Sequence, residues 1–367
     1  MTVHTETVHT ETVHADTRAY EAWLESRGEV IAADLELKHR EMSAGLFPFL
    51  RATFYRWCRL WPAACPELTG APPLLAVGDL HVENFGTWRD VEGRLVWGVN
   101  DADEAQLMPY ALDLVRLATS ALIALEERSP MAADVAEAIL EGYRDGLKSG
   151  CRPFVLEEDH GWLRELALGE MRDPKRFWEK LQGFKAEEPK PEVRSLLLAR
   201  LPAGSSLDKI CHRVAGLGSL GRLRSVALAT LRGAAIAREI KALYPSAWSW
   251  VEGKGDAPIR CGDLAAGFGC PDPFLAFDLA ADRRSGWVTR RLAPQCCRVE
   301  LADLPHRRED RHLLRAMGRE TANIHLGSVH ALDAVTADLK SRPPHWLRDA
   351  AEAMAKATRA DWKAWRE

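Results

Sequence analysis

The fold of this 367-residue chain depends on two stretches of its sequence, GDLHVENFG at residues 78–86 and NDADEA at residues 100–105. Each follows a short apolar run, at residues 74–77 and 94–99, that is typical of a β-strand. The segment between them, WRDVEGR at residues 88–94, has the polar, Gly-containing composition of a hairpin turn. The pattern therefore predicts two strands separated by one hairpin, with a polar, acidic loop after each strand.

This arrangement would bring Asp79, Asn84 and either Asp101 or Asp103 together at the ends of adjacent strands. Carboxylate and amide oxygens suit Mg²⁺, which takes one or two carboxylates and completes its shell with substrate phosphates. The spacing from Asp79 to Asn84 is also that of a kinase catalytic loop, in which the Asp accepts the acceptor hydroxyl's proton and the Asn holds a metal. The alternative is that these residues satisfy loop backbone groups, as Asp and Asn often do.

A second motif, GLGSLG, occupies residues 216–221. The bare G-x-G-x-x-G pattern fits a dinucleotide-binding turn, which needs a helix directly after it, or a hairpin loop that covers phosphates. Residues 222–228 alternate polar and apolar side chains, which favours a strand and hence the hairpin, although their Ala- and Leu-rich composition keeps a helix open.

Two further residues are candidates for the same site. Lys241 lies on the next apolar run and could pair with nucleotide phosphates, although most lysines are solvated surface residues. Asp113 lies one turn into an apolar helix, where a carboxylate costs stability unless it has partners. It could accept hydrogen bonds from backbone N–H groups of residues 78–86, or it could complement the helix dipole.

The chain divides by pattern into four parts. Residues 1–16 carry the repeat TVHTE, TVHTE, TVHAD and are expected to be a disordered tail. Helical periodicity dominates residues 17–200, strand-like runs dominate residues 201–300, and residues 301–367 are expected to form helices that pack on the first helical part. Predicted helices include residues 50–61, ending at Pro62, and residues 110–124, 131–147, 162–184, 307–330 and 345–365; predicted strands include residues 210–215, 223–231, 236–242, 273–278 and 287–292.

Composition limits the class of protein. An apolar fraction of 47% and a charged fraction of 28% are those of an ordinary globular protein, and a net charge of −4 argues against a dedicated nucleic-acid binder. There is no apolar run of membrane-spanning length and no signal-peptide pattern, so we expect a cytoplasmic protein without a membrane partner. The 8 cysteines form no C-x-x-C pair, which favours reduced thiols over a zinc site.

In this order, the motifs resemble an uncharacterised bacterial family filed as domain of unknown function 2252. The family resembles protein-kinase-like and aminoglycoside-phosphotransferase-like folds, with the glycine loop and lysine placed after the catalytic loop, as in a circular permutation. The resemblance implies a two-lobed, circularly permuted α+β fold that binds Mg·ATP between a helical lobe and a β-rich lobe. It extends from about Lys38 to His325, through the segments GDLHVENFG, NDADEA, PYALDLVRLATS, VAGLGSLGR, EIKA and VTRRL.

The resemblance also implies roles by position. The residues concerned are Asp79 as catalytic base; Asn84, Asp101 and, in reserve, Asp103 as metal ligands; Gly216, Gly218, Ser219, Gly221 and Lys241 as nucleotide-binding residues; and His81, Asp113 and Arg290 as supporting residues.

The sequence departs from the pattern of related phosphotransferases at several positions. Val77 stands where they usually carry His, and Ala102 replaces the aromatic residue usual in the family's second motif. No helix with a glutamate to pair Lys241 is evident after it, and Glu252 is a poor substitute. Because 11 residues separate Asp101 from Asp113, a protein-kinase activation segment would not fit there.

The resulting prediction is an ATP- and Mg²⁺-dependent phosphotransferase that acts on a hydroxyl group of a small molecule. Alternatives are a nucleotide-binding pseudokinase that regulates a partner, an AMP transferase and a peptide or protein kinase. An NAD-binding oxidoreductase is the weakest alternative, since it rests on the glycine motif alone and requires a helix after Gly221.

Overall fold

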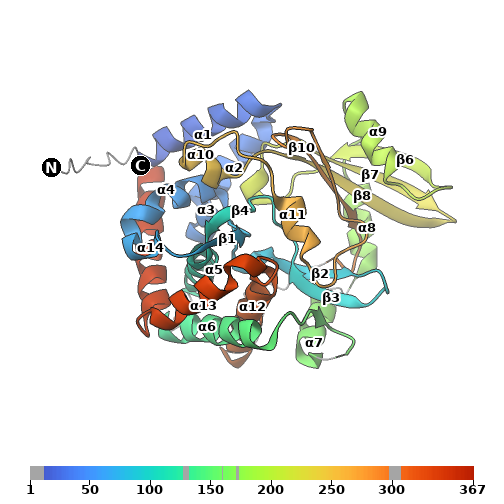
Figure 1. The fold of residues 1–367 in the computed structure, drawn as a ribbon. Coiled ribbons are helices and arrows are strands. Elements are labelled where there is room, and N and C mark those ends of the chain that lie inside the picture. Colours follow the sequence, from blue (N-terminus) through green and yellow to red (C-terminus); the bar gives the residue numbers. More distant parts are fainter. Residues whose placement is uncertain (1–11, 127–131, 159, 171–172, 297–306) are drawn as a thin grey trace.

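The computed structural model combines helices and antiparallel β-sheets, which confirms the α+β class (Figure 1). It describes residues 12–126, 132–158, 160–170, 173–296 and 307–367. Within these ranges, no helix is both long and apolar enough to cross a membrane. The described cysteines, at positions 58, 65, 151, 211, 261, 270 and 296, are free, and Cys297 lies outside the described residues.

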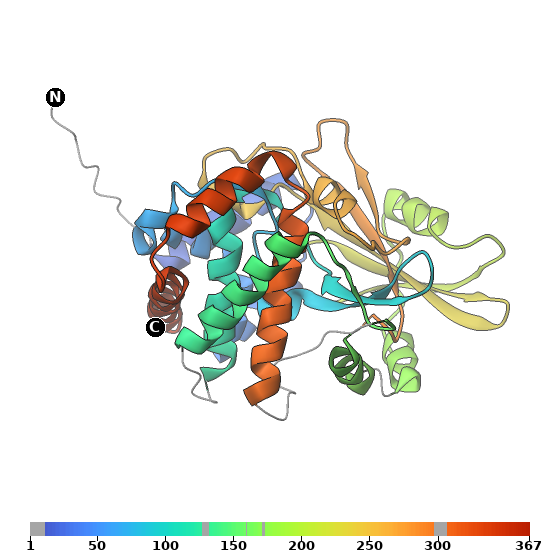
Figure 2. The ribbon, with the colours of Figure 1, turned by 60° about the horizontal axis from the view of Figure 1, so that its bottom comes forward.

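The helical part is assembled from two stretches of the chain. Helix α14 packs on α4, α5 and α6, while α12 runs along α6, so the later stretch completes a core begun by the earlier one (Figure 2). The helices of this part are α1 (Val13–Arg27), α2 (Ala32–Ala44), α3 (Leu46–Ala52), α4 (Phe54–Ala64), α5 (Tyr110–Ala124), α6 (Ala132–Ser149), α12 (Arg307–His325), α13 (Leu332–Ser341) and α14 (Trp346–Trp365).

The strands form three sheets. The small sheets pair β1 (Pro73–Ala76) with β4 (Gln106–Pro109), and β2 (Phe85–Arg89) with β3 (Leu95–Val99) and β5 (Phe154–Val155). The β-rich part is one antiparallel sheet in the order β6-β7-β8-β10-β9. Its strands are β6 (Ser206–His212), β7 (Arg224–Leu231), β8 (Ala234–Leu243), β9 (Ala276–Leu279) and β10 (Gly286–Leu292).

Short helices cover the five-stranded sheet and connect it to the rest (Figure 1). Leu181 of α8 (Pro174–Gln182) packs against Val226 and Leu228 on one face. Leu197 of α9 (Pro191–Ala199) packs against the other face. The remaining helices are α7 (Gly161–Glu170), α10 (Ala247–Val251) and α11 (Cys261–Ala266).

The predicted boundary of the N-terminal tail at residue 16 is wrong, because α1 begins at Val13. Thr12 caps this helix by accepting a hydrogen bond from Ala15 N at 3.2 Å. Val13 and Asp16 are buried, and Asp16 is ion-paired with Arg56 of α4. The last copy of the repeat is therefore the start of a packed helix, while residues 1–11 lie outside the described part.

Three helix predictions also need correction. The predicted helix at residues 50–61 is divided at Thr53 between α3 and α4, and α4 continues past the predicted stop at Pro62 to Ala64. The predicted helix at residues 162–184 is two helices, because Asp173 caps α8 by accepting hydrogen bonds from Lys175 N and Arg176 N. The predicted helix at residues 307–330 ends at His325, and α13 was not predicted.

The prediction that adjacent strands carry the two acidic loops is wrong in its pairing. β1 pairs with β4, and β3 pairs with β2, so the two loops follow strands of different sheets. The four-residue strand β4, which ends in Pro109, was too short to be recognised from its sequence. The two acidic loops nevertheless lie close together, because residues of both line one cavity.

Candidate functional site

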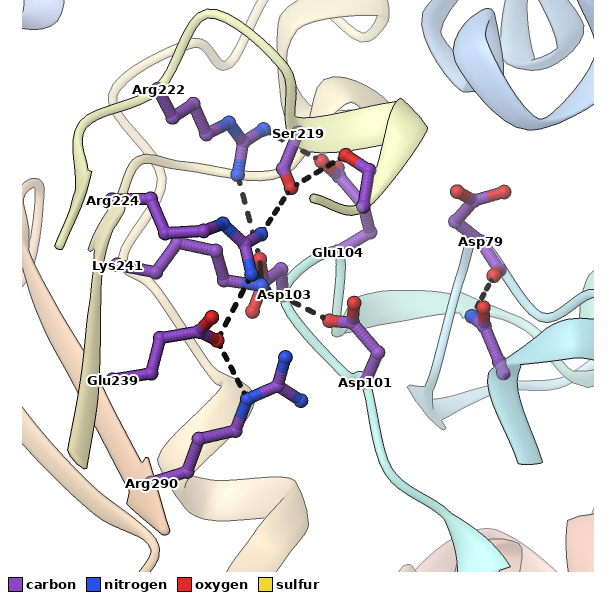
Figure 3. A network of polar contacts seen from close by, with 12 residues as sticks. Asp79, Asp101, Asp103, Glu104, Ser219, Arg222, Arg224, Glu239, Lys241 and Arg290 are labelled. Atoms are coloured by element: carbon purple, nitrogen blue, oxygen red, sulfur yellow. Dashed lines mark hydrogen bonds and ion pairs between the residues drawn. The ribbon is translucent and has the colours of Figure 1, made fainter. Parts of the chain in front are cut away.

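Three loops converge where the helical part faces the five-stranded sheet (Figure 3). They are the loop after β1, the loop after β3 and the glycine loop between β6 and β7. Together they line a cavity of about 50 Å³, to which Asp79, Asp101, Asp103, Gly216 and Gly218 contribute. Residues from all three predicted motifs therefore lie around one small space.

Asp113 holds the loop after β1 in shape. Its carboxylate accepts hydrogen bonds from Val77 N and Gly78 N, both at 2.8 Å, as the capping interpretation expected. It also lies 3.0 Å from His325 Nε2 of α12, and both side chains are fully buried. Gly78 has φ +87°, and an added Cβ would lie 2.7 Å from Glu104 O, so the conformation and the space both require glycine there.

Asp79, the predicted base, is paired with Arg116 of α5. Its Oδ1 accepts hydrogen bonds from Arg116 Nε at 3.0 Å and Nη2 at 2.6 Å. Arg116 is fully buried and lies against the rings of Phe54 and Trp57. Burial raises the pKa of Asp79 to about 6, an effect that Arg116 opposes and that nearby Glu104 strengthens.

The sequence did not single out Arg116, although a signal was present. Asp113 and Arg116 are three residues apart on α5, so they share a helix face, and both reach the loop that contains Asp79.

Asn84 and His81 support the same loop. Asn84 lies in the short 3₁₀ turn Val82–Asn84 and donates its side-chain N–H to Asp79 O. Its side-chain oxygen, rather than this nitrogen, would be the atom that holds a metal. His81 is buried, accepts a hydrogen bond from Glu83 N at 3.2 Å through Nδ1, and meets the ring of Phe47 edge-on.

Lys241 pairs with the acidic loop after β3. Its Nζ lies 3.3 Å from Asp101 Oδ1 and also forms an ion pair with Asp103 (Figure 3). Burial and the charge of Asp101 raise the pKa of Asp103 above its ordinary value, although Lys241 opposes this shift. Glu252 lies elsewhere, on the surface, and pairs with Lys254. The partners of Lys241 are thus the two predicted metal ligands instead of a glutamate on a helix.

The glycine loop approaches Asp79 closely. A Cβ on Gly218 would lie 3.5 Å from Asp79 Oδ2 and 3.0 Å from Arg51 O, so a side chain there would require the backbone to shift by a few tenths of an ångström. Gly216 and Gly221 have positive φ, which favours glycine. Ser219 accepts a hydrogen bond from Arg224 Nη2 at 2.7 Å.

Strand β7 follows Gly221. The NAD-binding alternative requires a helix at this position, so that prediction is wrong.

Glu104 at the end of the second acidic stretch connects the loops. It accepts hydrogen bonds from buried Arg222 at 2.9 Å and from Ala247 N at 2.6 Å. Arg222 directly follows the glycine loop, and Ala247 begins α10. This carboxylate therefore links the loop after β3 to the end of the glycine loop and to the start of α10.

A second, larger cavity of about 440 Å³ adjoins the first. Its polar lining includes Asp101, Asp103, Lys241, Arg213 and Arg290. Its apolar lining comes from α11, β9, β10 and the segment between α11 and β9, and includes Ala265, Phe268, Leu275, Phe277 and Val288. The cavity is large enough for a ligand with one apolar and one charged end.

Sequence reasoning also missed a cluster around Glu239. This buried carboxylate lies on β8 two residues before Lys241, on the same face of the sheet. It accepts hydrogen bonds from Arg224 at 2.9 Å and Arg290 at 2.8 Å and is also paired with Arg213. Burial would raise the pKa of Glu239, but the arginines hold it well below its ordinary value. Arg290 is thus placed by Glu239.

The donor chemistry of the site fits Mg²⁺. In the described part of the chain, no three His, Cys, Asp or Glu side chains lie together, as they would in a site that binds a metal through protein ligands alone. Asp101 and Asp103 supply two carboxylates, and Asn84 an amide oxygen. Since Mg²⁺ needs few protein ligands when phosphates complete its shell, this set is sufficient for a nucleotide-bound ion but not for a dedicated protein cage.

Comparison with known families supports the recognition of the motifs. Residues 30–161 match the model of the family described as uncharacterized protein conserved in bacteria (DUF2252), the family that the motifs resemble. The matched region contains both acidic stretches and Asp113 but ends before the glycine loop. Searches of the curated proteins and of the solved structures gave no match.

Proposed function

We propose that this chain has a circularly permuted, protein-kinase-like fold and is an ATP- and Mg²⁺-dependent phosphotransferase that acts on a hydroxyl group of a small molecule. The observation that carries the proposal is the contact of Lys241 with Asp101 and Asp103. It joins the strand lysine of the β-rich part to the acidic loop of the helical part, beside a cavity of about 440 Å³. A phosphate-binding lysine facing metal-binding carboxylates is the arrangement that phosphoryl transfer requires.

The larger cavity has both apolar and charged lining residues, as a nucleotide site needs. The base would lie against Phe268, Leu275 and Phe277, and the phosphates would lie beside Lys241 and Gly216. Asp101, Asp103 and the side-chain oxygen of Asn84 would hold Mg²⁺, which supplies neutralisation of phosphate charge. Lys241 would then leave the two carboxylates for the phosphate oxygens, because the metal takes its place beside them.

Asp79 would orient the acceptor hydroxyl and receive its proton. With a pKa of about 6 it is mostly ionised at neutral pH, as a base must be. Arg116 holds one of its oxygens, and the other faces the glycine loop. The short chain between Asp101 and Asp113 contains β4 and provides no peptide-binding segment, which supports a small acceptor.

The contact of Asp79 with Arg116 also favours a second candidate, a nucleotide-binding regulator without turnover. Arg116 lowers the proton affinity of Asp79 below that of the same buried carboxylate without an arginine, which opposes its use as a base. Transfer of AMP in place of a phosphoryl group would release pyrophosphate in place of ADP, so the product identifies that reaction.

Calorimetric titration with ATP, with and without Mg²⁺, tests the proposed site. We expect Mg²⁺-dependent binding that Asp101→Asn and Lys241→Met each weaken about tenfold or more. Lys254→Met, a change at an exposed lysine, should leave it unchanged. The ammonium group of Lys241 is paired with both carboxylates and competes with a cation for them. Lys241→Met should therefore also increase the affinity for Mg²⁺ alone. No binding of ATP to the unmodified protein at millimolar concentration would refute the proposal.

Turnover separates the two candidates. Slow release of ADP in the presence of hydroxyl-bearing acceptors, lost in Asp79→Asn with ATP binding retained, supports the phosphotransferase. ATP binding with no release of ADP or pyrophosphate across a broad acceptor panel supports the regulator instead.

A further inference from the structure

The charges around Glu239 are out of balance. Arg213, Arg224 and Arg290 surround this single carboxylate. Lys241, on the same face of the sheet, is paired with Asp101 and Asp103, whose charges also act on Arg290, so four cations share three carboxylates. Partly buried cations in excess over their counter-charges cost free energy, because each has lost some of its hydration. An anion bound beside the arginines would restore the balance.

The arginines differ in what they can reach. Arg224 is 3% exposed and is turned into the protein, where it also binds Ser219. Arg213 and Arg290 are 24% and 26% exposed, and both line the cavity of about 440 Å³. These two side chains are therefore the ones that a bound ligand could contact.

The geometry of Arg290 leaves its outer end toward the ligand space. Arg290 binds Glu239 through Nε, and its two terminal nitrogens lie on the side of Asp101 (Figure 3). Glu239 pairs directly across the strands with Arg290, so β8 and β10 fix this contact. The planar guanidinium group suits two phosphate oxygens at once.

We propose that Arg213 and Arg290 are phosphate-binding residues and that Glu239 is the positioning residue that aims them at the cavity. The ligand class is a nucleotide with at least two phosphates, and the inference rests on the proposed function for the base and for Mg²⁺. The pairing of Lys241 with two aspartates in place of a helix glutamate is thereby explained: the arginine pair, held by Glu239 on the strand of Lys241, provides the fixed positive charge that a lysine–glutamate pair would otherwise provide. Lys241 then becomes the movable cation.

The test compares ligands with different numbers of phosphates at fixed ionic strength. Adenosine, AMP, ADP, ATP and inorganic tripolyphosphate are titrated by calorimetry into the unmodified protein, Arg290→Gln and Arg213→Gln. The tripolyphosphate titration is done in EDTA, so that it reports on the arginines without Mg²⁺. Arg290→Lys tests the guanidinium group separately from the charge. Thermal unfolding of each variant shows whether it is folded.

Arg291→Gln is the matched control. Arg291 follows Arg290 on β10 and lines the same cavity, but it lies 3.8 Å from Asp272 and over the ring of Phe274. It therefore measures the effect of removing any positive charge from this cavity.

The proposal expects ATP, ADP and tripolyphosphate to bind Arg290→Gln and Arg213→Gln about tenfold to a hundredfold more weakly, with adenosine unchanged and Arg290→Lys intermediate. Arg291→Gln should change these affinities by less than about threefold. Full affinity in both glutamine variants, or an equal loss in Arg291→Gln, would overturn the assignment of the arginines while leaving the ATP site intact. Binding of tripolyphosphate but not ATP to the unmodified protein would keep the arginine site and remove the proposed function; binding of neither would remove both.

Discussion

Asp113 fixes the loop that carries Asp79 through its hydrogen bonds with Val77 N and Gly78 N. Replacing it with Asn removes the charge and at least one of the acceptors used by Val77 N, Gly78 N and His325. Buried hydrogen-bond networks lose about 3–5 kcal/mol when one charged member is removed. We expect the free energy of unfolding in urea to fall by about that amount in Asp113→Asn. Asp134→Asn, near the start of α6, is the control, and a loss of less than about 1 kcal/mol in Asp113→Asn would contradict the role given to it.

Glu320 of α12 makes the stability of the protein depend on pH. It accepts hydrogen bonds from Asn323 at 2.8 Å and from Val99 N, and it lies against Gly98 of β3. Burial raises its pKa from 4.5 to about 7. Because the folded protein keeps this proton to a higher pH than the unfolded chain does, the contribution of Glu320 to stability is full below pH 4.5 and is lost as the pH rises through 7.

Glu320→Gln should therefore gain stability relative to the unmodified protein as the pH rises. Between pH 5 and pH 8 we expect the difference in unfolding free energy to shift by about 2 kcal/mol in favour of the variant. Urea unfolding at both pH values measures it, with Glu157→Gln as an exposed control. Parallel pH profiles for Glu320→Gln and the unmodified protein would rule out this assignment.

At the level of single residues, the sequence identified the candidates whose importance follows from their immediate neighbours in the chain. A carboxylate in an apolar helix needs partners, and Asp113 has them. Arg116 and Glu239 were missed, because their importance depends on which distant loop or strand faces them. The partners of Lys241 lie about 140 positions earlier in the chain, a pairing that periodicity alone does not predict.

Among the helices, the packing of α6 on α12 depends on residues without side chains. A Cβ on Gly142 would overlap the carbonyl oxygen of Arg315, and one on Gly318 would overlap that of Ile139. A Cβ on Gly146 would lie 2.5 Å from Ala322 Cβ. The small residues four positions apart on each helix thus allow the two backbones to touch.

Gly142→Ala should destabilise the protein by about 2–4 kcal/mol, even though alanine favours a helix by about 1 kcal/mol over glycine. The loss would come from separating α6 and α12. Gly161→Ala in α7 is the matched control, because no atom lies within 4 Å of its added Cβ. Thermal and urea unfolding of both variants measure the difference, and equal stability would show that the helices can move apart without cost.

The elements that could be predicted are those with a strong local pattern. Alternation after Gly221 predicted β7, and Pro109 followed by apolar residues predicted α5. The pairing of β1 with β4 could not be predicted, since four residues carry too little pattern. The start of α1 was missed because the repeat hides a capping threonine in its last copy.

Across the whole molecule, Arg56 ties the first helix to the last. It pairs with Asp16 of α1 and binds Asp361 of α14 through Nε at 2.6 Å and Nη2 at 3.1 Å. Arg56→Met keeps the apolar stem but removes the charge between two carboxylates. We expect a loss of about 3 kcal/mol in unfolding free energy and earlier cleavage of α1 and α14 in limited proteolysis. Arg348→Met, on the surface of α14, should change neither, and the proposed link fails if the two variants behave alike.

The two-part construction of the helical core has a consequence for synthesis. Strands β6 to β10 are contiguous in the chain and pair largely with sequence neighbours, so this sheet can form soon after it leaves the ribosome. The apolar surfaces of α5 and α6 are not buried until α12 and α14 pack on them, and these helices are translated only after the sheet. During that interval the nascent chain has a folded sheet and an exposed apolar helical core, the kind of surface to which chaperones bind. Any slowing of translation through residues 206–292 would prolong this state.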